Sequence, residues 1–261
     1  MSDRILELEE TAINAFPALQ TELYRGWILR FSDGYTHRGN CVNPLYPLMG
    51  DMEEALSYCE ERYFSLGLNC TYKLTPGSLP ELECLLSQRG YDRKNSAVVM
   101  TASLSTPVED PAGVTIAERV SSVWLGGFLA LKGVDKPAEA RAARAMIGNI
   151  SLPVYCASIR RGGKPAGCAL GVLERGRVGL FDLYVDPELR RQGLGGALCR
   201  AVMNAGFRDG AGGAYLQVAV GNEGAQRLYE SLGFTPCYEY WYRVRRCPGQ
   251  LVEEKDPQWA K

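Results

Sequence analysis

An apolar run that ends at a proline and passes into a basic, glycine-rich turn constrains the fold of this chain most strongly. The run at 178–185 has the composition of a strand, and the turn at 186–196 reads Asp-Pro-Glu-Leu-Arg-Arg-Gln-Gly-Leu-Gly-Gly. Beyond the turn, apolar side chains recur at helical spacing as far as Ala205. A helix that begins at such a turn offers unpaired amides and the positive end of its dipole. The segment therefore predicts an anion-binding turn between a strand and a helix.

The charge composition restricts any such anion site to a local patch. The chain has 261 residues with 29 basic and 30 acidic side chains, and its formal net charge is −1. This balance gives no overall attraction for nucleic acid or an anionic membrane, so neither is predicted as a partner. No apolar run approaches the roughly 20 residues that span a bilayer, and the charged start does not resemble a signal sequence. We therefore expect a cytoplasmic protein.

The nine cysteines and the single histidine give little support for a metal site. The cysteines form no Cys-x-x-Cys pair, and most lie in apolar patterns typical of small core residues. His37 would have to carry any Ser-His-Asp mechanism, and no Gly-x-Ser-x-Gly motif accompanies it. We predict neither a metal nor such a triad.

Prolines and acidic residues interrupt the apolar pattern at 105–111, which we interpret as a linker between two lobes. The expected domains are 1–106 and 112–246, followed by a C-terminal tail at 247–261. In the second lobe the pattern predicts a mixed α/β sheet flanked by helices. The expected strands are 113–118, 154–160, 166–174, 178–185, 214–219 and 238–244, and the expected helices are 121–132, 137–149, the glycine turn to about 207, and 223–232.

Two motifs in the second lobe resemble the GNAT superfamily of N-acetyltransferases. Arg190-x-x-Gly193-x-Gly195 is similar to the acyl-CoA motif of that family, and it follows a Val-Asp-Pro strand end as the family prefers. About thirty residues later, the run 222–234 is similar to the family's Asn-x-x-Ala-x-x-Leu-Tyr-x-x-x-Gly-Phe helix. The resemblance covers residues 112–246 and implies the GNAT acyl-CoA N-acyltransferase fold.

The two lobes correspond when the numbering is shifted by 143 positions. The shift places Val-Asn-Pro at 42–44 on Val-Asp-Pro at 185–187, and Arg-Gly-Tyr at 89–91 on Leu-Gly-Phe at 232–234. In the first lobe, however, Pro47 stands in place of Arg190, and acidic residues at 51, 53 and 54 follow. Acids at a helix start repel pyrophosphate. We therefore predict that the first lobe is a degenerate GNAT-like lobe, in tandem with the second, that does not bind CoA.

The resemblance implies an acetyl-CoA-dependent N-acetyltransferase that works by direct attack in a ternary complex. The acceptor would be a primary amine of a small molecule, a peptide or a protein, and either a monomer or a homodimer fits the sequence. The cosubstrate would be held by one strand end, the glycine turn and the next helix. The residues implied are Leu183, Tyr184, Val185, Arg190, Arg191, Gln192, Gly193, Leu194, Gly195, Gly196 and Asn222.

Two side chains are candidates for the proton transfers. Tyr229 holds the position where many family members place the acid that meets the CoA sulfur. A phenol of pKa about 10 is a weaker acid than a thiol of about 8.5, by about 2 kcal/mol, so we expect a hydrogen bond that strengthens as the thiolate leaves. Asp182 is the candidate base, because alternation places it on one strand face with Tyr184. Glu239, or a water chain with no dedicated base, is the alternative.

Two other classes of function stay open at this point. An acyl-CoA-binding regulatory protein would keep the cradle without a productive acceptor site, and a scaffold would have lost both. Thiol release with amine acceptors separates an enzyme from a regulator, and a rise in melting temperature with CoA separates either from a scaffold. Acetyl and longer acyl groups are both compatible with the motifs.

Overall fold

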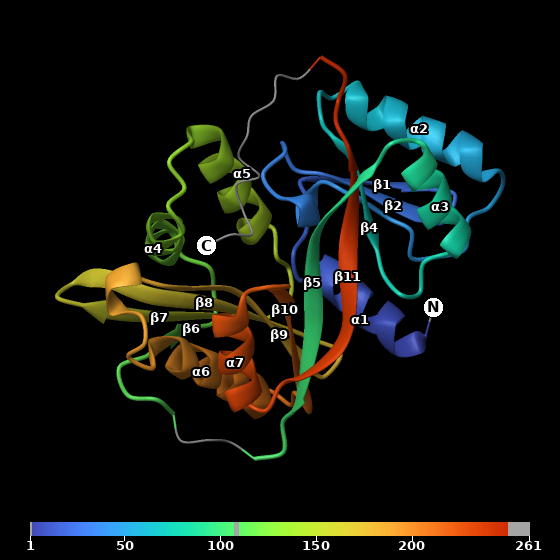
Figure 1. Ribbon diagram of the computed structural model, residues 1–261. Helices are drawn as coiled ribbons and strands as arrows, with labels where there is room; N and C mark the ends of the chain where they lie inside the picture. Colours follow the sequence, from blue (N-terminus) through green and yellow to red (C-terminus); the bar gives the residue numbers. More distant parts are fainter. Residues whose placement is uncertain (1, 107–109, 250–261) are drawn as a thin grey trace.

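The computed structural model describes residues 2–106 and 110–249 (Figure 1). The middle of the predicted linker, 107–109, and most of the predicted tail, 250–261, lie outside the described residues. Within the described ranges the chain forms one mixed sheet of eleven strands in the order β1-β2-β3-β4-β11-β5-β10-β9-β8-β7-β6. Helices flank this sheet, so the predicted α/β class is confirmed.

The first half of the chain builds three of the helices and five of the strands in the described ranges. They are α1 (Asp3–Asn14), β1 (Gln20–Tyr24), β2 (Trp27–Phe31), the short turn η1 (His37–Gly39), β3 (Val42–Asn43), α2 (Met52–Phe64), β4 (Cys70–Leu74), α3 (Pro80–Gln88) and β5 (Asp92–Ser103). No helix in the described ranges has both the length and the hydropathy to cross a membrane.

The second half contains every helix and strand predicted for it, with ends that agree within three residues. They are β6 (Thr115–Ala117), α4 (Ser122–Lys132), α5 (Pro137–Gly148), β7 (Val154–Arg161), β8 (Lys164–Glu174), β9 (Arg177–Val185), the turn η2 (Pro187–Leu189), α6 (Leu194–Arg208), β10 (Gly213–Ala219), α7 (Glu223–Ser231) and β11 (Thr235–Arg245).

The offset of 143 positions relates four consecutive elements of the two halves. It places α2 on α6, β4 on β10, α3 on α7 and β5 on β11, and the first residues of the paired elements agree within one position. The helix-strand-helix-strand path is thus the same in both halves.

The last strand of each half pairs inside the other half, as the central strands of Figure 1 show. β5 lies between β11 and β10, and Ser103 is opposite Gly213 in an antiparallel ladder. β11 lies between β4 and β5, and Arg245 is opposite Cys70. The predicted two lobes are therefore joined by backbone hydrogen bonds in one continuous sheet, which a linker alone does not suggest.

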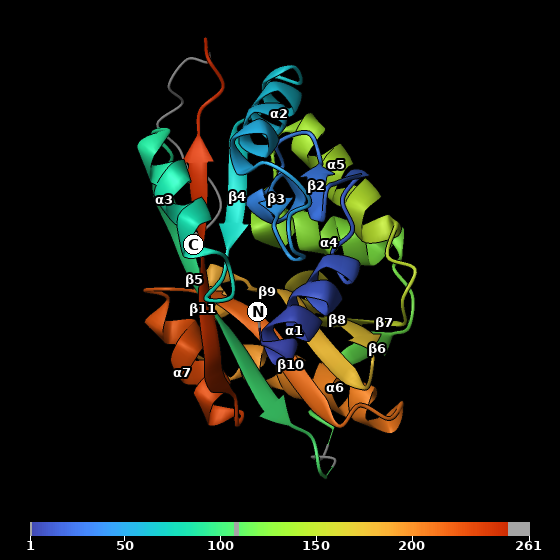
Figure 2. The same cartoon turned by 90° about the vertical axis from the view of Figure 1, so that its right-hand side faces the viewer.

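Helix α1 begins the chain but packs against the sheet of the second half (Figure 2). Leu8 and Ala12 belong to the same buried cluster as Phe181 of β9. Glu9 is fully buried, where it accepts a hydrogen bond from Lys73 of β4 at 2.6 Å and another from the Tyr238 hydroxyl of β11 at 2.7 Å. Removing one partner of a buried ion pair costs about 3–5 kcal/mol, so Glu9 fixes α1 to both halves.

The two faces of the second half carry different helices. One face packs α6 and α7 against β9 and β10 through Leu198, Val202 and Leu180. The other face packs α1, α4 and α5 through Phe128 and Met146. The edge of β9 therefore lies between two layers of helices, with α6 and α7 on one face and α1, α4 and α5 on the other.

Candidate active site

The predicted anion-binding turn connects β9 to α6. Asp186 opens it, because its side chain accepts a hydrogen bond from the Glu188 amide at 3.0 Å. Arg191 and Gly193 adopt positive φ values of 63° and 79°. Within 2–106 and 110–249, no protein acceptor receives the amides of residues 191–196. Unpaired amides at the start of a 15-residue helix are a ready site for a phosphate.

The three glycines of the turn have two different structural roles. A Cβ on Gly195 would lie 3.2 Å from Leu228 of α7, and one on Gly196 would lie 3.3 Å from Arg200. Both glycines therefore permit close packing around the start of α6. Gly193 has open space around it, but its left-handed backbone favours glycine.

Strands β9 and β10 diverge next to this turn. They pair in parallel from Arg177 and Gly213 to Leu180 and Leu216, and both continue beyond that point. On its other side, β9 stays paired with β8 as far as Val185. The edge of β9 that faces β10 therefore has no ladder partner at Leu183, Tyr184 and Val185.

A β-bulge lies where this divergence begins. Phe181 is opposite Leu170 and Tyr184 is opposite Cys168, so two residues of β9 share one position of β8. The first of these two residues, Asp182, has a φ of 48°. A bulge bends its strand and increases the local twist, which accounts for the separation of β9 from β10.

Tyr229 lies on α7, next to the open edge of β9. Its ring packs edge-on against Phe234, with centroids 6.1 Å apart. Burial raises the pKa of Tyr229, and interactions with Cys199 and Tyr184 raise it further. Within the described part of the chain its hydroxyl has no hydrogen-bond partner, although Tyr184 is near enough to affect its pKa. The phenol is thus a protonated group available to a ligand.

Asp182 is buried beside the same strand edge on the opposite face of the sheet. Its side chain is 5% exposed, and one oxygen lies 4.0 Å from the guanidinium of Arg38. The other oxygen has no hydrogen-bond partner within the described ranges. Burial, followed by the charge of Asp182, raises the pKa of Tyr184. The carboxylate therefore neighbours Tyr184 and keeps one oxygen able to accept a proton.

Asp182 and Tyr184 share one face of β9, because alternation holds from Asp182 onward: Tyr184 belongs to the cluster beneath α4, and Leu183 and Val185 belong to the cluster beneath α6. Alternation along the whole strand would place Phe181 on the face opposite Tyr184, yet Phe181 also belongs to the cluster beneath α4. The bulge adds a residue between Phe181 and Tyr184, so the alternation is interrupted where Phe181 meets Asp182.

The alternative base, Glu239, lies elsewhere. It belongs to β11, and β5 and β10 separate β11 from β9. Three strand spacings of about 4.8 Å amount to about 14 Å. Glu239 instead pairs with Arg93 at 3.6 Å on the surface. The structure brings only the other candidate, Asp182, to the open strand edge.

The remaining predicted residues lie around the turn. Arg190 is exposed and its Nε donates to the Val185 carbonyl at 3.4 Å. Asn222 caps α7, because its side-chain oxygen accepts from the Ala225 amide at 3.2 Å. That cap leaves the amide nitrogen of Asn222 as the group available to a ligand.

The sequence did not identify which residues of the first half reach this region. Arg38, in η1, reaches Asp182 and stacks over Phe16 at 4.4 Å. Its neighbour His37 packs against Tyr242 with ring centroids 5.2 Å apart. The offset of 143 pairs His37 with Leu180 of β9, but His37 itself lies in η1 and not in a strand. No local pattern signals these contacts, because they depend on how the two halves pair.

The described residues show no group of three or more His, Cys, Asp or Glu side chains suited to a metal. Seven of the nine cysteines are buried. Burial raises the pKa of the Cys168 thiol to about 12, which is typical of an unreactive core cysteine.

The glycine turn before α6, the diverging parallel strands and the tyrosine of α7 together define a GNAT-type acyltransferase fold. A solved GCN5-related N-acetyltransferase from Kribbella flavida shares it with a TM-score of 0.67 at 19% identity, covering 96% of this chain and 97% of that one. A tandem GNAT protein from the clavulanic acid biosynthesis pathway shares it with a TM-score of 0.64 at 13% identity, covering 94% and 89%. The GNAT fold expected from the motifs is confirmed.

The family is shown by the sequence itself. The protein-family model described as "Probable histone acetyltransferase Rv0428c C-terminal" matches residues 2–243 of this chain. The chain belongs to this acetyltransferase family and is an N-acetyltransferase of the GNAT superfamily.

Two curated relatives support this assignment. The "Uncharacterized N-acetyltransferase YobR" of Bacillus subtilis (strain 168) is 28% identical over 253 residues, which cover 94% of this chain and 100% of the relative. A "[Ribosomal protein bS18]-alanine N-acetyltransferase" of Escherichia coli (strain K12) is 37% identical over 76 residues, which cover 29% of this chain and 51% of that enzyme.

Proposed function

We propose that the second half of this chain binds acetyl-CoA and transfers its acetyl group to a primary amine by direct attack in a ternary complex. The observation that carries the proposal is the combination of unpaired amides at residues 191–196 with the unpaired edge of β9. The unpaired amides suit a pyrophosphate. The unpaired strand edge suits the amide groups of an extended pantetheine arm.

Each part of this surface has a distinct binding role. The amides of 191–196 would receive the pyrophosphate, and the side chains of Arg190 and Arg191 would add positive charge. The backbone of Leu183, Tyr184 and Val185 would pair with the pantetheine and donate to the thioester oxygen as negative charge develops there. The amide nitrogen of Asn222 would bind the pantetheine or phosphate region.

Two side chains would move protons. Bound acetyl-CoA supplies a thioester whose carbonyl carbon the amine attacks, and the bond to sulfur breaks. Tyr229 would donate its hydrogen bond to the leaving sulfur, and its raised pKa keeps that proton in place until the thiolate forms. Asp182 would accept the amine proton, directly or through a water molecule, at its unpartnered oxygen.

We further propose that the first lobe, 1–106, binds no CoA and that 112–246 is the catalytic domain. At the start of α2, the Asp51 carboxylate accepts the Glu54 amide at 2.8 Å. Glu54 in turn binds Arg25 at 2.7 Å. At the start of α2, the Asp51 carboxylate therefore occupies the anion-binding position that stays open at the start of α6.

The names of the family and of one relative concern histones and a ribosomal protein, which are proteins with amine acceptors. For this chain the proposal covers a primary amine of a small molecule, peptide or protein. A cytoplasmic location, a monomer or homodimer, and no nucleic-acid or membrane partner stay predictions.

Release of free thiol from acetyl-CoA in the presence of a panel of primary amines tests the proposal. We expect amine-dependent thiol release and an acetylated product of matching amount. Tight CoA binding without turnover on any amine would favour the acyl-CoA-binding regulatory alternative. Absence of CoA binding would contradict the proposal altogether.

A further inference from the structure

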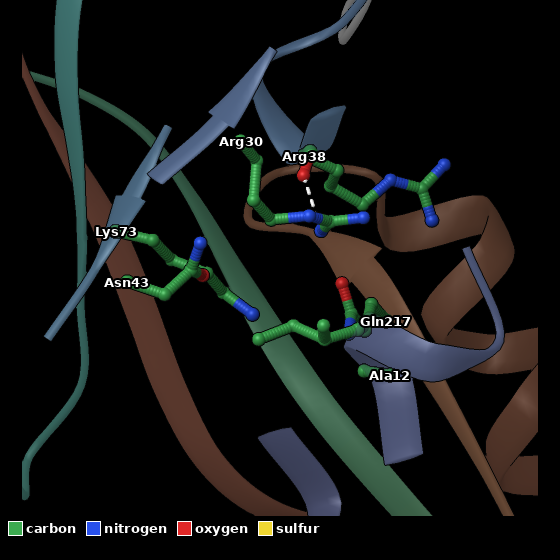
Figure 3. Close-up of a pocket in the computed structure, with 7 residues that line it drawn as sticks. Ala12, Arg30, Arg38, Asn43, Lys73 and Gln217 are labelled. Atoms are coloured by element: carbon green, nitrogen blue, oxygen red, sulfur yellow. Dashed lines mark hydrogen bonds between the residues drawn. The ribbon is translucent and has the colours of Figure 1, made fainter. Parts of the chain in front are cut away.

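A pocket lies between the two halves, on the face of the sheet that carries α1 (Figure 3). Gln217 lines it, and this residue is the first of β10 beyond its last pair with β9. The other polar lining residues come from the first half. They are Arg30, Arg38, Asn43 and Lys73. The pocket thus lies at the point where β9 and β10 diverge. Its polar lining has three cations, two amides and no carboxylate.

Arg30 is the most unusual member of this lining. It is only 3% exposed, and its two terminal nitrogens donate to the backbone carbonyls of Arg38 and Phe16. Its Nε has no hydrogen-bond partner, and no carboxylate lies within ion-pair distance in the described ranges. A buried guanidinium without a counter-ion is strongly unfavourable, so this position calls for an anion.

The carboxylates nearby are already engaged. Lys73 pairs with Glu9 at 2.6 Å, and the second oxygen of Glu9 accepts from Tyr238. Arg38 has Asp182 at 4.0 Å. Three cations therefore share two carboxylates, and one positive charge is left without compensation.

The pocket also connects with the proposed chemistry. Arg38 lines it and faces Asp182, the candidate base at the open edge of β9. The side chain of Arg38 is 21% exposed and that of Lys73 is 5% exposed, and Arg30 is buried. Arg38 is therefore the most exposed of the three cations, and Arg30 and Lys73 lie deeper.

We propose that this pocket recognises a carboxylate of the acceptor, so that the substrates are amines that carry a carboxylate. Planar carboxylates suit arginine donors, and the two amides supply neutral donors beside them. The same cations would repel a lysine-rich acceptor. This inference rests on the proposed acetyl transfer, because it names the class of acceptor for that site.

Matched acceptors test the inference. Thiol release from acetyl-CoA is compared for the L-amino acids and for the corresponding carboxamides, which keep the amine and lose the negative charge. We expect kcat/KM for the best acid to exceed that of its amide at least about 10²-fold. Arg30→Gln should lower this preference at least about tenfold, while the Kd for CoA stays within about twofold.

Two further variants keep the test decisive. Arg38→Gln removes the most exposed of the three cations and should also lower the preference, even where Arg30→Gln fails to fold because its two carbonyl contacts are lost. Arg208→Gln removes an exposed arginine that pairs with Asp110 at 2.9 Å, and it should change nothing.

The outcomes separate the inference from the proposed function. Equal rates for acids and amides with normal CoA binding would overturn the inference alone. Absence of CoA binding and of turnover with every amine would overturn the proposed function. In that case thermal unfolding with each amino acid decides the inference: a higher Tm in the wild type but not in Arg38→Gln supports it, and no shift overturns it.

Discussion

Ala97 and Tyr240 lie opposite one another in the sheet, and they are separated by the same 143 positions that relate the two halves. Each residue therefore faces its own equivalent, which is the mark of a local two-fold axis. The axis passes between β5 and β11. The exchange of last strands is mutual, so each half completes the sheet of the other.

The exchange predicts that the second half does not fold alone. A fragment of 112–261 would keep β11 but would lose β4 and β5, the two strands on either side of it. We expect this fragment to show no cooperative thermal transition. Co-expression with 1–106 should restore a single complex that unfolds cooperatively and binds CoA. A lone 112–261 fragment that unfolds cooperatively and binds CoA with full affinity would show that the exchange is dispensable.

Replacing Tyr229 with phenylalanine should slow the reaction without unfolding the protein. The change removes the proposed proton donor, so kcat should fall by about 10²- to 10⁴-fold. Since this hydroxyl has no partner among the described residues, the free energy of unfolding should change by less than about 1 kcal/mol. Tyr46→Phe is the matched control, because it removes a surface hydroxyl that donates to Glu10. Full activity of the Tyr229 variant would exclude the acid role.

The pH dependence of kcat/KM should rise to a plateau. Burial raises the pKa of Tyr229 above its ordinary value of about 10, so the phenol keeps its proton through pH 10. The acceptor amine loses its proton over the same range and becomes reactive. Rates measured from pH 6 to pH 10 should therefore show no descending limb. A fall with an apparent pKa between 8 and 9 that vanishes in Tyr229→Phe would contradict this expectation.

Replacing Asp182 with asparagine tests the proposed base. Asparagine tolerates the positive φ of this position, but it does not accept a proton at neutral pH. We expect kcat to fall about 10²-fold with the Kd for CoA unchanged. Glu239→Gln is the control and should stay within about twofold. The reverse pattern, with activity lost in Glu239→Gln alone, would move the base to β11.

Much of the second half could be predicted from local sequence. Its helices and strands follow periodicity, and the turn before α6 is encoded by glycines whose backbone or packing requires them, such as Gly193. The offset of 143 was equally local information, and it relates α2, β4, α3 and β5 to elements of the second half.

The features that depend on distant pairing could not be predicted in this way. Nothing in the pattern of β5 says that it lies between β10 and β11. The bulge at Asp182 and the reach of Arg38 toward it likewise depend on neighbours far away in sequence. The uncompensated charge of Arg30 becomes visible only after its surroundings are known.

We propose that each chain has one CoA site, at the start of α6. Arg190→Glu reverses the charge of the turn and should weaken CoA binding at least about 10²-fold. Gly50→Ala changes the first-half residue that the offset of 143 places on Gly193; its φ is 108°, and the new Cβ would lie 3.1 Å from the end of the Arg25 side chain. It should cost about 1–2 kcal/mol of stability through its backbone conformation.

Calorimetric titration of acetyl-CoA into the wild type and these two variants distinguishes one site per chain from two. We expect one acetyl-CoA per chain in the wild type, the same affinity in Gly50→Ala, and no measurable binding in an Arg190→Glu variant that still unfolds cooperatively. Two sites per chain, or full affinity in Arg190→Glu with binding lost in a folded Gly50→Ala, would contradict it.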